Sequence, residues 1–289
     1  MVNIYEQISS NKRRSAFIII FFVIFIIAVS YGISYAFDVQ GLLPFAVVFS
    51  IGSSLVSYFA GDKIVLSLNG AKPVTRKEFF DFYTVTENMA QVAQIPTPKI
   101  YVVVSDSMNA FATGRDPEHA VVCATTGLLA KLNRTELEGV IGHELSHIKN
   151  YDIRLMTIVS ILIGTLSILI NMSWHIRRGD DDNKNSGIFM IIGIILIIFA
   201  PLIAQLIQLA ISRRREYFAD ASSVMLTRQP SGLISALEKI SGDPNILATA
   251  STATASLYIN NPFKGNKIAS MFSTHPPITD RIKALEGMM

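Results

Sequence analysis

The sequence contains very little cysteine. Cys123 is the single cysteine among 289 residues, so no disulfide can form within the chain. It lies in the apolar segment 120–124, which predicts a thiol buried in a core rather than a reactive one. The lack of a disulfide framework fits a reducing compartment.

Charged residues are also scarce. They make up 16% of the chain, whereas typical soluble domains contain roughly 25%. Hydrophobic residues make up 50%, and the mean hydropathy is +0.41, which indicates contact with lipid. The net charge of +3 is too small to predict a nucleic-acid partner. No internal repeat of solenoid length is present in the sequence.

Long apolar runs predict four transmembrane helices, which cover residues 15–37, 42–61, 155–174 and 186–212. Each run has about 20 residues or more, enough to cross a hydrocarbon core of ~30 Å. The chain is therefore expected to divide into four parts: an N-terminal membrane hairpin (1–66), a first soluble segment (67–154), a second membrane hairpin (155–212) and a second soluble segment (213–289).

Two basic clusters predict the orientation of these spans. Residues 12–14 precede the first span and residues 213–215 follow the fourth. An even number of spans places both clusters on one side, and the positive-inside bias makes that side cytoplasmic. The segment 61–154 lies on the same side, so we expect both soluble segments in the cytoplasm.

The strongest functional signal is the segment 143–147, which reads His-Glu-Leu-Ser-His. On a helix, residues four apart lie on one face, so His143 and His147 can both reach one zinc ion. Glu144 is then placed as the general base for a zinc-activated water, without binding the metal itself. Thr135 and Glu138 have capping-box spacing, which predicts that this helix begins near Thr135.

A catalytic zinc site with two histidines needs a third protein ligand and an open position. Glu216 and Asp220 follow the fourth apolar run and lie four residues apart, on one face of a predicted helix. Glu216 could be the third ligand, and Asp220 could accept the free N–H of a ligand histidine. The second membrane hairpin would bring these carboxylates back to His143 and His147.

The rest of the soluble part predicts a small α+β domain. Helical periodicity covers residues 78–93, and β-rich segments cover residues 99–104, 109–114 and 120–125. Pro230 introduces a helix that runs to about Ile240, and Pro276 and Pro277 open a last helix toward Leu285. Residues 247–257 are rich in Ala, Ser and Thr, which predicts a mobile loop.

Four segments together resemble the HtpX-like membrane zinc metalloproteases, a family related to the CAAX prenyl endopeptidases. They are residues 109–114 (NAFATG), 143–147 (HELSH), 212–220 (SRRREYFAD) and 272–277 (FSTHPP). The resemblance covers essentially the whole chain. It implies a mainly α membrane protein with four transmembrane helices and a cytoplasmic α+β zincin-like (gluzincin) domain with a small sheet. It also implies one zinc ion per chain, with Glu216 as the third ligand.

The resemblance further implies a stress-response and quality-control endopeptidase of the bacterial inner membrane. Its partners would be the lipid bilayer and damaged or misfolded membrane proteins, which it would cut on the cytoplasmic side. Residues Asn109, Ala110, Phe111, Ala112 and Thr113 resemble the family's edge strand, which could bind an extended substrate through main-chain hydrogen bonds. His275 or Arg281 could donate a hydrogen bond to the oxyanion of the reaction.

Three other functions fit the sequence less well. An intramembrane protease would need the zinc motif inside a span, but charged residues such as Glu138 and Asp152 flank it. A structural zinc protein would more often close the site with four protein ligands. A transporter would show a paired set of interrupted membrane helices, which the sequence lacks.

Overall fold

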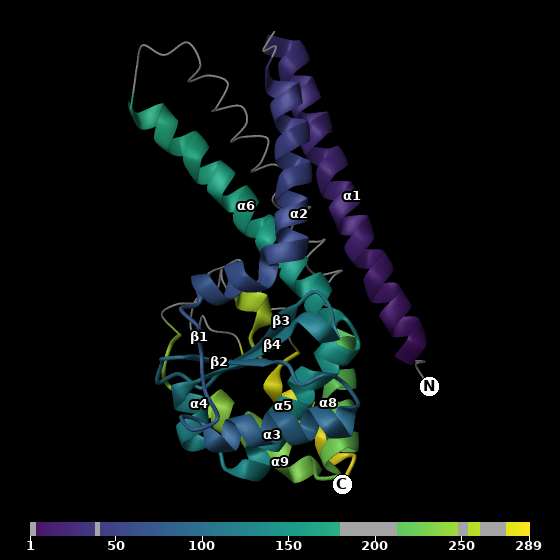
Figure 1. The fold of residues 1–289 in the computed structure, drawn as a ribbon, viewed down its shortest axis with the longest axis vertical. Helices are drawn as coiled ribbons and strands as arrows, with labels where there is room; N and C mark the ends of the chain where they lie inside the picture. The colour runs from purple at the N-terminus through teal and green to yellow at the C-terminus, as the bar shows by residue number, and fades with distance from the viewer. Residues whose placement is uncertain (1–3, 38–40, 180–212, 248–253, 261–275) are drawn as a thin grey trace.

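The computed structural model describes residues 4–37, 41–179, 213–247, 254–260 and 276–289. Its long helices are α1 (Ile4–Phe37), α2 (Leu42–Leu68) and α6 (Asp152–Gly179). The shorter helices are α3 (Phe80–Ala93), α4 (Thr126–Lys131), α5 (Arg134–Lys149), α8 (Arg213–Thr227), α9 (Pro230–Gly242) and α11 (Ile278–Glu286), with 3-10 turns η1 (Pro117–His119) and η2 (Ala255–Leu257). The shorter helices and a small sheet form a globular part, from which the long helices project (Figure 1).

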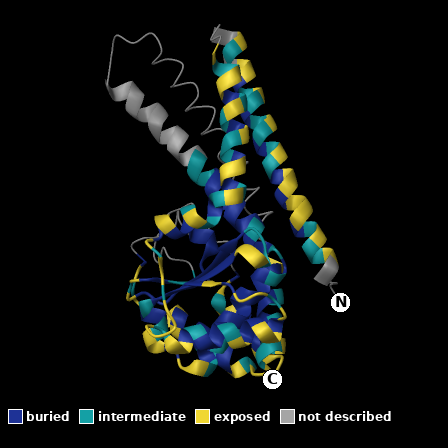
Figure 2. Cartoon of the chain, viewed as in Figure 1, coloured by how far each residue is buried: buried dark blue, intermediate teal, exposed yellow. Residues whose placement is uncertain are grey.

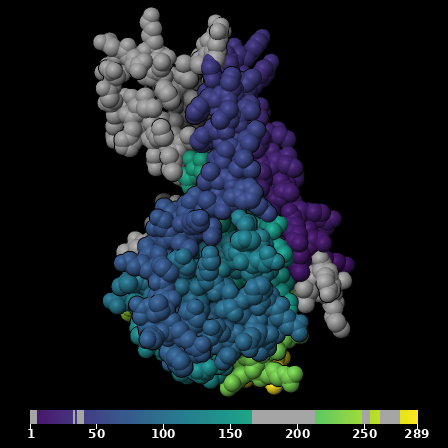
Figure 3. Space-filling model, viewed as in Figure 1, coloured from purple at the N-terminus to yellow at the C-terminus, as the bar shows by residue number. Residues whose placement is uncertain are grey.

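Two of the long helices have the length and composition of membrane spans, Glu6–Gly32 within α1 and the whole of α2. They project from the globular part (Figure 3) and expose large apolar side chains such as Phe17 and Val48, at 60% and 73% (Figure 2). Such faces are unfavourable in water and fit contact with lipid.

The third predicted span is helical in the structure, because α6 covers residues 155–174. The fourth predicted span, residues 186–212, lies outside the described residues. The four-span organisation and the four-part division of the chain therefore stay predictions.

The sheet has four strands, β1 (Lys72–Pro73), β2 (Lys99–Val103), β3 (Ala110–Gly114) and β4 (Ala120–Thr125). Their order is β1-β2-β4-β3, with β2 and β4 parallel and the other two pairs antiparallel. The three β-rich segments are thus confirmed as strands, and β3 lies at an edge. The sequence did not reveal β1, because two residues show no alternation and one of them is a proline.

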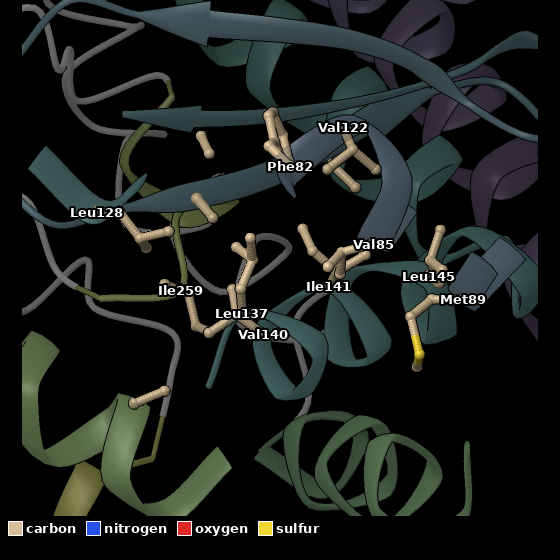
Figure 4. Close-up of a cluster of buried hydrophobic side chains, with 14 of the residues drawn as sticks. Phe82, Val85, Met89, Val122, Leu128, Leu137, Val140, Ile141, Leu145 and Ile259 are labelled. Carbon is tan, nitrogen blue, oxygen red and sulfur yellow. The ribbon is translucent and has the colours of Figure 1, made fainter. Parts of the chain in front are cut away.

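Side chains of the sheet alternate between two hydrophobic cores, as the pleat of a strand requires. Ala112 and Val122 face a core that also contains residues of α3, α5 and α9, and Figure 4 shows Val122 with Ile141 of α5. Phe111 and Cys123 face a second core built with α1, α2 and α6. The sheet therefore lies between α5 and the long helices, and β3 contacts α5, α2 and α6.

Helix α5 begins at Arg134, and its capping box differs from the predicted one. Oδ1 of Asn133 accepts from the Glu136 N–H at 2.9 Å, and Oε2 of Glu136 accepts from the Asn133 N–H at 2.8 Å. The predicted pair, Thr135 and Glu138, has the same spacing but lies inside the helix. Glu136 is further fixed by Lys239 of α9, whose Nζ lies 2.8 Å from Oε2. This contact between α9 and α5 distinguishes the observed capping box from the predicted one. Local sequence patterns do not reveal it.

The prediction of a mobile loop over residues 247–257 is wrong for its last residues. Ala255 and Leu257 are buried in η2, and Tyr258 is fully buried. The Tyr258 ring packs edge-on against Phe111 of β3, with 5.1 Å between ring centroids, and its hydroxyl donates to Asn69 after α2. Aromatic burial next to an Ala/Ser/Thr-rich stretch thus orders this segment. Residues 248–253 lie outside the described residues.

Candidate active site

Three side chains from two helices converge in the globular part. His143 and His147 lie one turn apart on α5, and Glu216 lies in the first turn of α8. The Nε2 atoms of the histidines are 3.2 Å apart. Oxygens of Glu216 lie 3.5 Å from Nε2 of His143 and 3.6 Å from Nε2 of His147. None of the three residues is more than 4% exposed. The structure therefore brings together the three residues that the sequence singles out as metal ligands.

The size of this triangle fits a zinc ion. Zinc binds nitrogen and oxygen ligands at about 2.0–2.2 Å, so two ligands of one tetrahedral ion lie about 3.3–3.6 Å apart. The three distances, two of which go to different oxygens of Glu216, fall close to that range. One ligand atom from each of the three residues lies within 4.8 Å of the other two, so the group could hold a metal ion. With three protein ligands, a fourth position would remain for the reaction.

Asp220 supports the far side of the His143 ring. Its Oδ1 lies 2.9 Å from Nδ1 of His143, and Arg281 of α11 donates to the same carboxylate at 2.6 Å and 2.8 Å. Burial raises the pKa of Asp220, but Arg281 and His143 lower it more. The pKa of this carboxyl group therefore lies below its usual range. An ionised Asp220 accepts the Nδ1 proton of His143, so that Nε2, which points toward Glu216, is the nitrogen that a metal can bind.

Burial and the charge of Arg281 lower the pKa of His143, but hydrogen bonds with Asp220 and Glu216 raise it more, to about 9. A cation that binds at this ring must therefore displace a proton, so metal binding is coupled to pH.

His147 has an equivalent support that the sequence did not reveal. Oδ2 of Asp152 lies 3.2 Å from its Nδ1, and Asp152 is only 3% exposed at the start of α6. Between α5 and α6, Tyr151 adopts a left-handed conformation with φ 61°, which turns the chain. Asp152 comes five residues after His147, and side chains with this spacing do not lie on the same face of a continuous helix. The turn is therefore what brings the carboxylate to the ring.

Glu144 lies next to His143 on α5 and is 2% exposed. Burial of Cys123 on β4 raises the pKa of its thiol, and the negative charge of Glu144 raises it further. The pKa of this thiol is therefore far above its ordinary value. The prediction that Cys123 is buried in a core is confirmed.

Arg281 is fully buried, and its contacts lie behind the ligand side chains. Besides Asp220, it reaches the Ile259 carbonyl oxygen at 3.4 Å and Nδ1 of His143 at 3.3 Å, and its Nη1 is 3.9 Å from Glu216. This geometry favours a role in positioning Asp220 over donation to an oxyanion. His275, the other candidate donor, lies outside the described residues.

The edge strand β3, which contains Ala110, Phe111, Ala112 and Thr113, packs against α5, the helix that carries His143 and His147. Thr125 N–H donates to the Asn109 carbonyl oxygen at 3.0 Å, which directs the main chain of Asn109 toward β4. Main-chain groups alternate along a strand. Phe111 and Thr113 therefore also pair with β4, whereas Ala110, Ala112 and Gly114 direct their main-chain groups outward.

Two of these outward positions have partners. The Ala110 carbonyl oxygen accepts from Ile259 N–H at 3.0 Å, and Gly114 N–H donates to Oγ1 of Thr157 at 3.3 Å. Within the described part of the chain, the N–H and C=O of Ala112 have no such partner. Ala112, which is 3% exposed, is therefore the outward position of β3 whose main-chain groups bind no other described residue.

The chain is similar in sequence and in fold to known proteins. The sequence profile of peptidase family M48 matches residues 77–289. Proteins named protease HtpX homolog from Streptococcus uberis and Ligilactobacillus salivarius are each 44% identical over 296 residues, covering 99% of this chain and 100% of the relative. A crystal structure of S. mikatae Ste24p matches with a TM-score of 0.52 at 20% identity, covering 98% of this chain and 67% of that one, which indicates a shared fold.

These matches confirm the resemblance that the four sequence segments indicated. They extend over nearly the full chain and agree with a buried His-His-Glu cluster in which a metal can be bound. The chain therefore belongs to peptidase family M48 and is a metallopeptidase.

Proposed function

We propose that this metallopeptidase is a membrane-bound zinc endopeptidase, with one zinc ion held by His143, His147 and Glu216. The observation that carries the proposal is the buried triangle of these side chains, with Glu144 beside it on α5. Its substrates would be damaged or misfolded membrane proteins, cut on the cytoplasmic side of a bacterial inner membrane. The apolar helices α1 and α2 and the basic residues 12–14 support this location.

The chemistry assigns a separate role to each carboxylate. A zinc ion at this site would acidify a water molecule and polarise the peptide carbonyl. Glu144 takes the proton from the attacking water and delivers it to the leaving amine. Asp220 and Asp152 hold the Nδ1 protons of the two histidines, so that both rings direct their Nε2 atoms toward Glu216.

An unfolded segment of a substrate would bind as an added strand beside β3. The N–H and C=O of Ala112 would pair with the substrate main chain, between the positions covered by Ile259 and Thr157. Main-chain recognition tolerates many sequences, which suits an enzyme that removes damaged proteins.

The proposal is tested with the purified full-length protein in detergent, supplied with zinc and with casein as an unfolded substrate. The wild type should cleave casein. Glu144→Gln should lower the rate at least 100-fold and retain zinc, because the general base is lost and the ligands are not. Glu216→Ala should lose both zinc and cleavage.

A matched control is Glu138→Gln, because Glu138 lies on the same helix and pairs with Arg134 at the surface. It should cleave like the wild type. Undiminished cleavage by Glu144→Gln would refute the role of the base. Full zinc occupancy in Glu216→Ala would refute the ligand set.

The side of the membrane is tested separately, by fusing a reporter after Met289. A reporter that is active only in the cytoplasm is the expected result. Activity only outside the cytoplasm would contradict a cytoplasmic active site and leave the zinc site unaffected.

A further inference from the structure

The N-terminal helix contributes a buried amide to the surroundings of the metal site. Asn11 of α1 is 4% exposed. Its Nδ2 donates to Oδ1 of Asp152 at 2.7 Å and to the carbonyl oxygen of Asn150 at 2.8 Å. An amide nitrogen has two N–H groups, so these contacts use its full donor capacity.

Asp152 connects this amide to a ligand histidine. One of its oxygens, Oδ2, lies 3.2 Å from Nδ1 of His147, and the other accepts from Asn11. Nε of Arg215 also approaches Oδ1, at 3.4 Å. A buried carboxylate needs donors to remain in one orientation, and the Asn11 amide makes the shorter of these two contacts.

The same part of α1 fixes the turn that carries Asp152. The Asn150 carbonyl lies at the end of α5, where helix carbonyls have no partner in the helix. Asn11 binds this carbonyl, and Nζ of Lys12 lies 4.2 Å from the centre of the Tyr151 ring. Residues 11 and 12 thus contact all three residues of the turn, including Tyr151 with its positive φ.

We propose that Asn11 is a positioning residue of the peptidase: it holds Asp152, which orients His147 toward the metal. The two ligand histidines then have parallel supports. Asp220 is held by Arg281 from the C-terminal helix, and Asp152 is held by Asn11 from the N-terminal helix. A displacement of α1 in the membrane would therefore change the metal affinity. This inference rests on the proposed role of His147 as a ligand.

The test measures zinc affinity by competition with a chelator, using the full-length protein in detergent. Asp152→Asn should weaken zinc binding about 10- to 100-fold, as expected for the partner of a ligand histidine. Asn11→Leu keeps a similar volume without donors and should weaken it about tenfold. Asn11→Asp, which has the size of asparagine, provides a second variant; it places a like charge beside Asp152 and should weaken binding at least as much.

The double variant Asn11→Leu/Asp152→Asn should bind zinc no more weakly than Asp152→Asn alone, because both changes interrupt one connection. Ser15→Ala is the matched control. Ser15 is a buried residue one turn further along α1, and its hydroxyl bonds only the Asn11 carbonyl oxygen among the described contacts. It should leave zinc affinity unchanged.

Asn11 variants with wild-type zinc affinity and a lower melting temperature would overturn the inference and make Asn11 a packing residue. Fully additive losses in the double variant would also overturn it. Either outcome leaves the proposed function intact as long as the wild type binds zinc and Glu216→Ala does not. A wild type that binds no zinc would instead refute the proposed function.

Discussion

Oδ1 of Asp220 lies 2.9 Å from Nδ1 of His143, on the opposite side of the ring from Glu216. The same carboxylate accepts two hydrogen bonds from the buried Arg281 guanidinium. Asp220 therefore joins the His143 ring on α5 to Arg281 on α11. A buried cation and anion of this kind depend on each other, because either one alone would be uncompensated.

Replacing Asp220 with asparagine tests this dependence. The unpaired Arg281 should cost about 3–5 kcal/mol of unfolding free energy, and zinc affinity should fall about 10- to 100-fold. Thermal unfolding and chelator competition measure the two effects. Asp280→Asn, an equal charge change at an exposed position of α11, should behave like the wild type. Equal behaviour of the two variants would show that the Asp220–Arg281 pair is dispensable.

The capping residue Glu136 predicts a pH-dependent stability. Burial raises the pKa of Glu136, but hydrogen bonds from Lys239, Ser235 and the Asn133 main chain lower it more, below the ordinary 4.5. A lowered folded pKa means that the ionised group stabilises the fold above pH 4.5, and that this contribution is lost as the pH falls through the folded value.

Glu136→Gln should therefore cost about 1–3 kcal/mol at pH 7, and its difference from the wild type should shrink below pH 4.5. Thermal melting across this pH range measures the effect, with Glu138→Gln as the control on the same helix. A difference that grows on acidification would contradict the assignment.

Two glycines of α5 predict opposite outcomes for the same substitution. A Cβ on Gly139 would lie 2.8 Å from the Leu233 main-chain nitrogen of α9, so Gly139→Ala must separate two helices. A Cβ on Gly142 would meet two side-chain atoms first, Oγ of Ser223 at 2.8 Å and Cε of Met89 at 3.1 Å, and the nearest main-chain atom outside its own helix is Cα of Ser223 at 3.4 Å.

Gly139→Ala should destabilise the protein by about 1–3 kcal/mol. Gly142→Ala should have a smaller effect, because alanine also gains roughly 1 kcal/mol of helix propensity over glycine. Melting temperatures of both variants decide the comparison, and a greater loss in Gly142→Ala would contradict it.

The outward N–H of Ala112 predicts a specific defect in substrate binding. Ala112→Pro removes this outward N–H and leaves the N–H groups that pair with β4 in place. Proline is tolerated on an edge strand where the replaced N–H points away from the sheet. Loss of one main-chain hydrogen bond should raise KM for casein about 3- to 10-fold. Zinc affinity should stay unchanged, which separates this defect from damage to the metal site.

A control for that variant is Phe111→Pro, which removes a donor to β4. It should lower the melting temperature strongly, whereas Ala112→Pro should change it little. Unchanged KM in a well-folded Ala112→Pro protein would exclude this position from substrate binding.

The comparison of sequence and structure separates local from distant information. The helix around His143 and His147 could be predicted because its four-residue spacing is a property of every α-helix. The three longer strands could be predicted because alternation and β-branched residues mark them locally. The capping box was misplaced by two residues, because Asn133–Glu136 and Thr135–Glu138 have equal spacing and only Lys239 and Ser235 of α9 distinguish them.

By itself, the sequence determined the chemistry of this protein: a pair of histidines with a glutamate between them, a later glutamate as their partner, and long apolar helices. These follow from residue type and short-range periodicity, which do not depend on the rest of the fold. Only the tertiary structure decided that Asp152 supports His147, that Asn11 supports Asp152, and that the main chain of Ala112 binds no other described residue on the outer side of β3. Those contacts depend on a left-handed turn at Tyr151 and on the packing of helices far apart in the chain, and no spacing along the sequence encodes them.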